Sequence, residues 1–256
     1  MSAYFVPLGP LTFRPTELTQ GAWRDDEQHV SIVCGLVGHV LEQHVPRPEM
    51  AYSRITFEIF GQVLREDMTF EVATIRPGRT IELVEVTGTC GERTILRVRA
   101  WRLVTSDTSS VEGVELPAMP ARSATEPRDV AAEWGGKFLK TIEWQAIPGG
   151  RDGRRQVWVH TAVDLVEGVQ AGPLARFLSL IDIANGIATR QRPGTMMFPN
   201  VELTVHLLRE PVTENGWVGL DTSVTFGDSG IGITHTVLND SLGPVGMATQ
   251  SLTLRL

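Results

Sequence analysis

One order of elements occurs twice in this sequence, and this repeat restricts the possible folds more than any other feature. In the first half, a hairpin-like segment around Gly9-Pro10 precedes an apolar stretch at residues 29–45, and β-rich segments follow. In the second half, two β-rich segments joined at residues 148–150 precede an apolar stretch at 172–191, and β-rich segments follow again. A helix followed by several antiparallel strands is an α+β pattern. The period, above roughly 100 residues, indicates a duplicated domain rather than a solenoid.

Both apolar stretches are predicted to be helices that the rest of the protein largely encloses. In residues 29–45, Val33 and Val37 follow helical spacing, and Leu36 widens the apolar face. Gly35 and Gly38 each cost about 1 kcal/mol against Ala in a helix interior, so we expect close packing there. The same spacing predicts one long helix over residues 172–191, through Leu174, Phe177, Leu178, Ile181, Ala184 and Ala188.

The strand segments on either side of residues 106–129 define two domains. The predicted strand segments are 53–60, 69–89, 93–104, 138–147, 154–163, 200–208, 217–226, 230–238 and 246–256. Residues 106–129 are rich in Ser, Glu, Pro and Gly, a composition that buries little and is typical of a linker. We therefore place an N-terminal domain at 1–105, a linker at 106–129 and a C-terminal domain at 130–256.

Charge and composition argue against several classes of protein. The sequence holds 30 acidic and 23 basic residues, a net charge of −7, whereas nucleic-acid binders usually carry a basic patch. No apolar run approaches the roughly 20 residues of a membrane span, and the opening MSAYFVPLGP does not resemble a signal peptide. Cys34 and Cys90 fit neither a zinc nor a disulfide pattern, so we expect a reducing, cytoplasmic location.

No motif indicates a metal, serine-hydrolase or dinucleotide site. His29, His39 and His44 lie on one helical segment, but their spacing does not give the i, i+4 pair of a zinc site. Ser223 and Ser229 are not in a Gly-x-Ser-x-Gly motif, and GIGIT near residue 230 lacks the helix of a dinucleotide fingerprint. We therefore expect neither a metal nor a cofactor.

Several segments, in the same order, resemble the acyl-CoA thioesterase II family. In the first half these are GAW, EQHV, SRITFEIF and IRPGRTIELVEVTGTCGERTILRVRAWRL. In the second half they are VWVHTAVDL, LSLIDIANGIA, PNVELTVHLLRE and VLNDSLGPVGMATQSLTLR. The resemblance covers nearly the whole chain apart from the linker. It implies an α+β double hotdog fold, in which each of two long helices is wrapped by antiparallel sheet and the sheets join in one chain.

The resemblance also implies a catalytic set of three polar residues. The family's Asp in the second helix falls on Asp182, and its Gln in the last strand falls on Gln250. The family's Thr at the start of the intervening strand falls on Asn200, a departure that still leaves a group able to donate and accept hydrogen bonds. Where relatives carry His-Gly-Gly at the first helix, this chain has His29-Val30-Ser31, so we do not expect the first half to bind ligand as relatives do.

Each of these three residues also has a purely structural interpretation. Asp182, flanked by isoleucines, could accept a hydrogen bond from a strand and hold its helix in place. Asn200 follows Phe198-Pro199 and is a common residue type at a turn that opens a strand. Gln250 could be a solvated residue of an edge strand, although the alternation of the strand favours an inward amide.

The implied activity is hydrolysis of an acyl-CoA thioester to a fatty acid and coenzyme A, within lipid metabolism. Asp182 would act as general base on a water that Asn200 and Gln250 help to hold, and no covalent intermediate is required. The arginines of the sheet could contact coenzyme A phosphates. Two alternatives stay open. One is an enoyl-CoA hydratase, which would use an Asp–His or Glu–His pair, although no His is near Asp182 in sequence. The other is a non-catalytic acyl-binding protein.

The sequence of the last strand of the first half predicts an interface between copies of this chain. Trp101, Leu103 and Val104 would give it an exposed apolar patch. Closed symmetric assembly is the commonest way to cover such a patch, so we expect a homo-oligomer.

Overall fold

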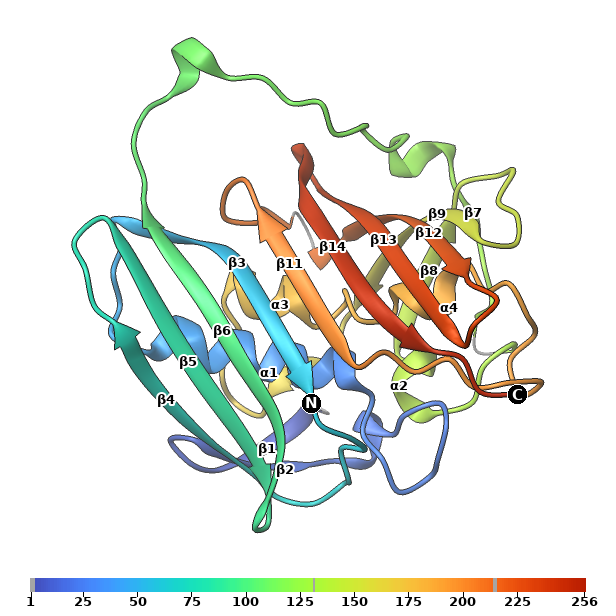
Figure 1. Cartoon of the computed structure of the whole chain (residues 1–256), viewed down its shortest axis with the longest axis horizontal. Coiled ribbons are helices and arrows are strands. Elements are labelled where there is room, and N and C mark those ends of the chain that lie inside the picture. Colours follow the sequence, from blue (N-terminus) through green and yellow to red (C-terminus); the bar gives the residue numbers. More distant parts are fainter. Residues whose placement is uncertain (1–2, 131, 214–215) are drawn as a thin grey trace.

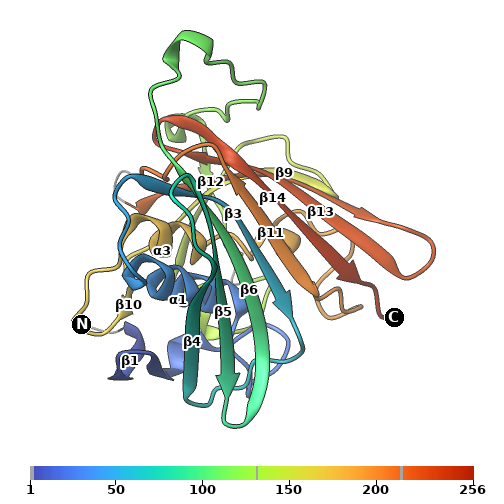
Figure 2. The same cartoon turned by 60° about the vertical axis from the view of Figure 1, so that its left-hand side comes forward.

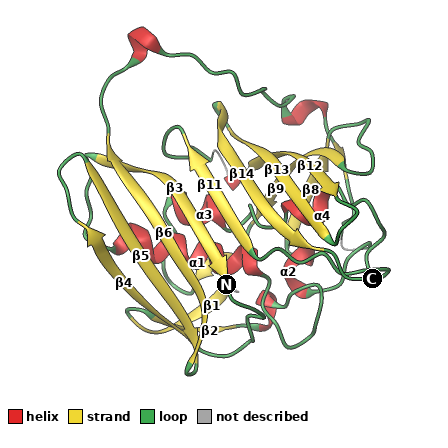
Figure 3. Ribbon diagram, viewed as in Figure 1, coloured by secondary structure: helices red, strands yellow, loops and turns green. Residues whose placement is uncertain are grey.

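The computed structural model of the protein describes residues 3–130, 132–213 and 216–256, and its strands form one 14-stranded sheet. The strands of the first half are β1 (Ala3–Gly9), β2 (Thr12–Pro15), β3 (Met50–Ile59), β4 (Met68–Arg76), β5 (Ile81–Cys90) and β6 (Arg93–Val104). Those of the second half are β7 (Glu126–Pro127), β8 (Ile142–Ala146), β9 (Arg154–Thr161), β10 (Asp164–Val166), β11 (Glu202–Leu207), β12 (Val218–Phe226), β13 (Ile231–Asp240) and β14 (Gly243–Thr253). The helices lie on one side of the sheet (Figures 1 and 3). They are α1 (Val30–Gln43), α2 (Lys137–Lys140), α3 (Pro173–Leu178) and α4 (Ala184–Ile187), with short 3₁₀ turns at Glu17–Thr19, Ser109–Val111 and Arg122–Ala124.

The two halves meet at the centre of the sheet. The strand order is β10-β1-β2-β4-β5-β6-β3-β11-β14-β13-β12-β9-β8-β7. β3 and β11 pair antiparallel, with Thr56 opposite Thr204, so one continuous sheet serves both halves. Buried apolar residues from both halves form one main core between this sheet and the helices.

The first half also contacts the second through its N-terminal strand. β10, which the sequence did not predict, pairs in parallel with β1 at the edge of the first half (Figure 2). The Tyr4 hydroxyl lies 2.6 Å from the Thr141 hydroxyl and 2.8 Å from that of Thr161. The halves are therefore joined at an edge of the sheet as well as at its centre.

The first predicted helix is confirmed, and its glycines lie where α1 crosses α3. A Cβ atom at Gly35 would clash with Ser179 Oγ, and one at Gly38 would lie 2.8 Å from Ala175 Cα. Real Cβ atoms do not approach backbone that closely, so the glycines permit the crossing. The close packing expected from the sequence is thus present.

The second predicted helix is not one long helix, so the expectation of two long helices is not confirmed. Over residues 172–191 the chain forms α3 and α4, of six and four residues, with turns between them. In these turns the N–H groups of Leu180 and Ile181 donate to the carbonyls three residues before them, as in a 3₁₀ turn. The Ser179 hydroxyl donates to the carbonyl of Ala175, a contact that bends helices.

Two further segments differ from the prediction. Residues 69–89, expected as one strand segment, form two antiparallel strands, β4 and β5, with residues 77–80 between them. Residues 138–140, expected to open a strand, belong to α2 instead. The Phe138 side chain is fully buried, and its N–H donates to the carbonyl of Gln20. Burial of this aromatic ring against the first half therefore overrides the local strand pattern.

The predicted linker crosses from β6 to β7 along one end of the molecule (Figure 1). Near its end, Glu126–Pro127 pair with β8 and so belong to the sheet. Trp158 Nε1 donates to the carbonyl of Pro120 at 3.0 Å, and the Arg122 guanidinium lies 4.7 Å from the Trp217 ring centre. These contacts hold the segment to the second half. The division into domains at 1–105 and 130–256, with a linker between them, stays a prediction.

None of the helices in the described residues has the length and apolar character needed to cross a membrane.

Candidate active site

Asp182 lies in the turns between α3 and α4, where the predicted long helix is interrupted. Its neighbours Ile181 and Ile183 point into the core, and Asp182 itself is only 3% exposed. The interruption therefore presents a carboxylate inside the protein rather than on a helix surface. A buried carboxylate of this kind needs hydrogen-bond donors.

Two side-chain amides supply those donors. Asn200 Nδ2 donates to Asp182 Oδ1 at 2.6 Å, and Gln250 Nε2 donates to the same oxygen at 2.8 Å. Asn200 precedes β11 and forms a bridge with Leu252 of β14, while Gln250 lies within β14. The structure thus brings together all three residues identified from the sequence. Their catalytic role stays a prediction.

The geometry also bears on the structural interpretations of these residues. Gln250 is 1% exposed, so the interpretation as a solvated edge residue is wrong. Its Oε1 is buried and has no hydrogen-bond partner among the described residues. Asp182 does accept hydrogen bonds from strand residues, as its structural interpretation requires, so its surroundings must decide its role.

Burial raises the pKa of the Asp182 carboxyl to about 7. The hydrogen bonds from Gln250 and Asn200 lower the pKa, and the negative charge of Glu202 raises it further. Desolvation penalises the charged form and is the largest of these effects. A carboxylate with a pKa near neutrality suits a general base, because it accepts a proton readily and is ionised in a useful fraction of molecules.

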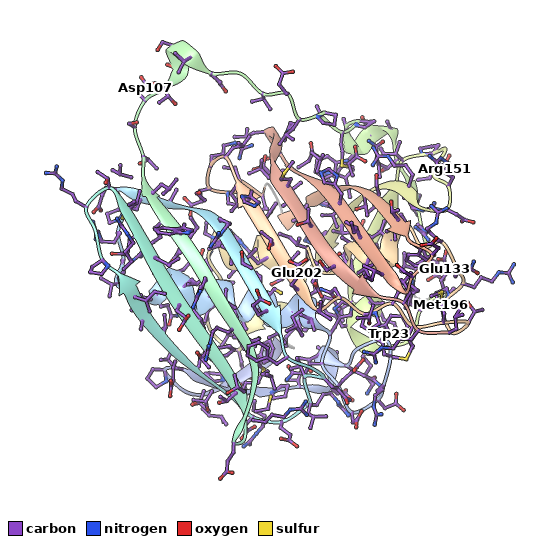
Figure 4. The ribbon with its side chains drawn as sticks, in the orientation of Figure 1. Trp23, Asp107, Glu133, Arg151, Met196 and Glu202 are labelled. Atoms are coloured by element: carbon purple, nitrogen blue, oxygen red, sulfur yellow. The ribbon has the colours of Figure 1, made fainter. Side chains whose placement is uncertain are left out.

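Asp182 lines a cavity of about 600 Å³, which we call the outer cavity. Both amides bind Oδ1, so Oδ2 has no hydrogen bond among the described residues and is available to a water molecule. Asn185 and Asn200 line the same cavity from the second half, and residues 21–24, 27–30 and 59–63 line it from the first. Figure 4 labels Glu202 on β11 and Trp23 on the loop that borders the cavity. The site therefore lies between the two halves.

His29 is a cavity residue that the sequence interpretation missed. It precedes α1, and its Nδ1 accepts the N–H of Ser31 at 3.2 Å. Burial lowers the pKa of His29 to about 4, so the ring is neutral and its proton is on Nε2. His29 lines the same outer cavity as Asp182, although no His is near Asp182 in sequence. Only the pairing of the two halves brings these residues together, and no local spacing could have shown it.

Across the described ranges, no three His, Cys, Asp or Glu side chains gather in a way that could hold a metal ion.

Comparison with protein families decides the identity of the chain. Residues 19–103 match the acyl-CoA thioesterase N-terminal domain, and residues 115–254 match the acyl-CoA thioesterase C-terminal domain. The chain belongs to the acyl-CoA thioesterase family. It is accordingly a hydrolase that cleaves acyl-CoA thioesters, with acyl-CoA as its substrate.

Solved structures show that this acyl-CoA thioesterase has the hotdog fold. A hotdog-fold protein from Alicyclobacillus acidocaldarius is 12% identical, with a TM-score of 0.74 over 98% of this chain and 95% of that one. The tesB protein of Mycobacterium avium subs. paratuberculosis is 14% identical, with a TM-score of 0.69 over 98% and 96%. Acyl-CoA thioesterase II TesB2 from Mycobacterium marinum is 16% identical, with a TM-score of 0.64 over 98% and 95%. No curated protein matches the sequence significantly.

Proposed function

We propose that Asp182 acts as the general base that activates a water molecule for direct attack on the thioester carbonyl. The observation that carries this proposal is a buried carboxylate with both amide donors on Oδ1 and with Oδ2 available in the outer cavity. Asn200 and Gln250 fix the orientation of the carboxylate and so determine where Oδ2 can hold water.

In the reaction, Asp182 takes one proton from water as the water oxygen bonds to the carbonyl carbon. The tetrahedral intermediate then collapses, the carbon–sulfur bond breaks, and coenzyme A leaves as a thiolate. The proton held by Asp182 passes to the leaving sulfur or to solvent. The products are a free acid and coenzyme A, and Asp182 is ionised again.

The developing negative charge on the carbonyl oxygen needs a hydrogen-bond donor. His29, in its neutral form, carries a proton on Nε2 and lines the outer cavity opposite the second half. We assign this N–H to the carbonyl oxygen, because a fixed donor in a desolvated site stabilises an oxyanion more than water does.

Coenzyme A would leave through the open side of the outer cavity. Arg24 and Arg255 line this cavity and could pair with its phosphates. The sequence also drew attention to four arginines of the sheet: Arg76, Arg79, Arg97 and Arg99. None of these four lines the outer cavity.

Replacing Asp182 with Asn tests the proposal. The variant keeps the size and an oxygen for the two amides but removes the base, so we expect kcat to fall by about 10²-fold or more. Thiol release from acyl-CoA measures this, with circular dichroism to verify the fold. The matched control is Glu42→Gln, which changes a half-buried carboxyl with a raised pKa, far from Asp182 in sequence. Near wild-type turnover of Asp182→Asn would make Asp182 a structural residue.

Two expectations from the sequence stay proposals: a cytoplasmic location and a homo-oligomeric state. Leu103 and Val104 are 37% and 42% exposed at the end of β6, which supports an interface there. Trp101, the third residue of the predicted patch, is only partly exposed and lies under the Arg76 guanidinium. Light scattering of the purified protein at micromolar concentration distinguishes an oligomer from a 28.1 kDa monomer.

A further inference from the structure

A second, smaller cavity adjoins the outer cavity, and aromatic side chains form part of its lining. This inner cavity has a volume of about 30 Å³. Four residues line both cavities: Ala22, Trp23, His29 and Asn185. The remaining walls of the inner cavity are Val130, Trp134, Leu139, Trp144, Ile183 and Gly186. An acyl group whose carbonyl lies beside Asp182 would extend past His29 and Asn185 into this space.

The inner cavity has room for only a short chain. A volume of about 30 Å³ holds roughly two groups of the size of a water molecule. The Trp134 ring packs edge-to-face on Trp23 and on Phe198, with ring centres 5.1 and 5.7 Å apart. Since close-packed rings yield little, a long acyl chain does not fit without repacking of this wall.

The wall of the inner cavity also contains an unsatisfied hydrogen-bond donor. Trp134 is 6% exposed, and its Nε1 is buried with no partner among the described residues. By contrast, Trp144 in the same wall donates from Nε1 to the carbonyl of Leu139 at 3.3 Å. Buried donors are nearly always paired, so an unpaired one beside a cavity points to a ligand acceptor.

The unpaired N–H lies at the edge of the ring that faces Gly186, another residue of the cavity wall. Trp134 Cζ2, Cε2 and Nε1 lie 3.5, 3.6 and 3.9 Å from the position that a Cβ of Gly186 would occupy. Asn185 and Gly186 follow Asp182 by three and four residues, along the turns that lead into α4 and its first residues. A substituent on the third acyl carbon is at a suitable distance from the carbonyl to approach them.

We propose that the preferred substrate is a short acyl-CoA whose third carbon carries a hydroxyl or keto oxygen, and that this oxygen accepts a hydrogen bond from Trp134 Nε1. This inference rests on the proposed function, because it takes the thioester carbonyl to lie beside Asp182. Asn185 Nδ2 donates to the carbonyl of Phe198 at 3.4 Å, so its Oδ1 can accept the proton of a hydroxyl. A hydroxyl therefore has two partners in this cavity, and a keto oxygen has one.

Thiol release from four substrates tests the proposal: butyryl-CoA, 3-hydroxybutyryl-CoA, acetoacetyl-CoA and decanoyl-CoA. We expect kcat/KM to be at least about tenfold higher for one or both oxygenated four-carbon substrates than for butyryl-CoA. Decanoyl-CoA should be poorer still. The ratio between the hydroxyl and keto substrates shows which oxygen the site prefers.

Two variants locate the effect. Trp134→Phe keeps an aromatic ring but removes the N–H, so the preference for oxygenated substrates should fall to about twofold or less. Trp144→Phe is the matched control, since the Trp144 N–H is already satisfied within the protein. It should retain the preference.

Equal kcat/KM for butyryl-CoA and both oxygenated substrates in the wild type would overturn the inference, as would a preference for decanoyl-CoA. An unchanged preference in Trp134→Phe would also overturn it. The wild-type measurements do not depend on the folding of a variant. Failure of the proposed function looks different, because no substrate would then be hydrolysed or Asp182→Asn would remain fully active.

Discussion

Each half of the molecule contains a carboxyl group whose pKa burial raises to about 7, but the two groups lie in different surroundings. Glu42 lies near the end of the continuous helix α1 and lines a cavity of about 340 Å³. Asp182 lies within the interrupted second helix and lines the outer cavity of about 600 Å³. The two cavities lie at opposite ends of the β3–β11 pair, since Tyr52 lines one and Ile59 the other.

The hydrogen-bond partners of the two carboxyl groups differ most. Glu42 Oε1 accepts the backbone N–H of Leu174 at 2.9 Å, at the start of α3. Its other oxygen is buried without a partner among the described residues. Asp182 instead accepts two side-chain amides from separate segments. Burial alone therefore raises a pKa in both halves, while only the second half adds two side-chain donors that fix the carboxylate toward a larger cavity.

Removing a donor from Asp182 is the largest expected change after loss of Asp182 itself. In Gln250→Ala the carboxylate loses one of its two amides, so its pKa should rise and its orientation should loosen. We expect kcat to fall by about 10²-fold, measured by thiol release. The counterpart in the first half is Tyr52→Phe, which removes a hydroxyl that donates to the carbonyl of Leu41 at 2.8 Å. That variant should keep kcat within about twofold, and an equal loss in both variants would contradict the contrast between the halves.

The pH dependence of the rate should follow Asp182. A general base must be ionised, so kcat/KM should rise with pH through about 7 and then level off. Between pH 6 and pH 8 a single group with that pKa gives roughly a tenfold increase. Glu42→Gln should leave this profile unchanged, because Glu42 lines the other cavity. A flat profile, or one that shifts in Glu42→Gln, would break the assignment of the base.

The smallest effect on activity is expected for Glu42→Gln, whose rate should stay within about twofold of wild type. Its effect should be on stability. The pKa of Glu42 is raised in the folded protein, from 4.5 to about 7, so the folded state binds the proton more tightly. Its contribution to the free energy of unfolding is therefore full below about pH 4.5, falls as the pH rises to about 7, and stays low above that.

Glu42→Gln removes that pH-dependent loss, so at pH 8 the variant should unfold at a higher denaturant concentration than wild type. Denaturant melts at pH 4.5 and pH 8 measure this, with Glu112→Gln in the exposed linker as control. A variant less stable than wild type at pH 8 would show that the charged form of Glu42 stabilises the fold.

Much of the fold could be predicted from the sequence because alternation and helical spacing are local signals. The positions of β3, β6, α1 and the last four strands followed from them, and so did the close packing at the α1 glycines, whereas β4 and β5 were predicted as one segment. The break after α3 could not be predicted in this way. Apolar residues three or four apart fit a continuous helix and a series of 3₁₀ turns equally well, so Leu178, Ile181 and Ala184 gave no sign of it.

The candidate site was predictable only in part. Asp182, Asn200 and Gln250 were found because each corresponds to a position in a family with known segments. His29 and Trp134 contribute through contacts between segments that are far apart in sequence, and no spacing reveals such contacts. The short strand β10 was missed for the same reason, since three residues carry no periodic pattern and its pairing partner is β1.

The claim that water attacks the thioester directly is tested most directly by a single turnover in H₂¹⁸O, with enzyme in excess over a hydrolysed acyl-CoA. If Asp182 acts as a base, the oxygen that enters the acid comes from water, so the product of the first turnover carries ¹⁸O. If Asp182 were a nucleophile, an anhydride between Asp182 and the acyl group would form first. Water attack on its aspartyl carbonyl would put the label in the peptide that contains Asp182, whereas attack on its acyl carbonyl would label the acid after an acylated peptide had formed. Mass spectrometry of the acid and of that peptide, in samples quenched during the turnover, distinguishes these cases. We predict labelled acid and a peptide that is neither labelled nor acylated; a labelled or acylated peptide would contradict the mechanism.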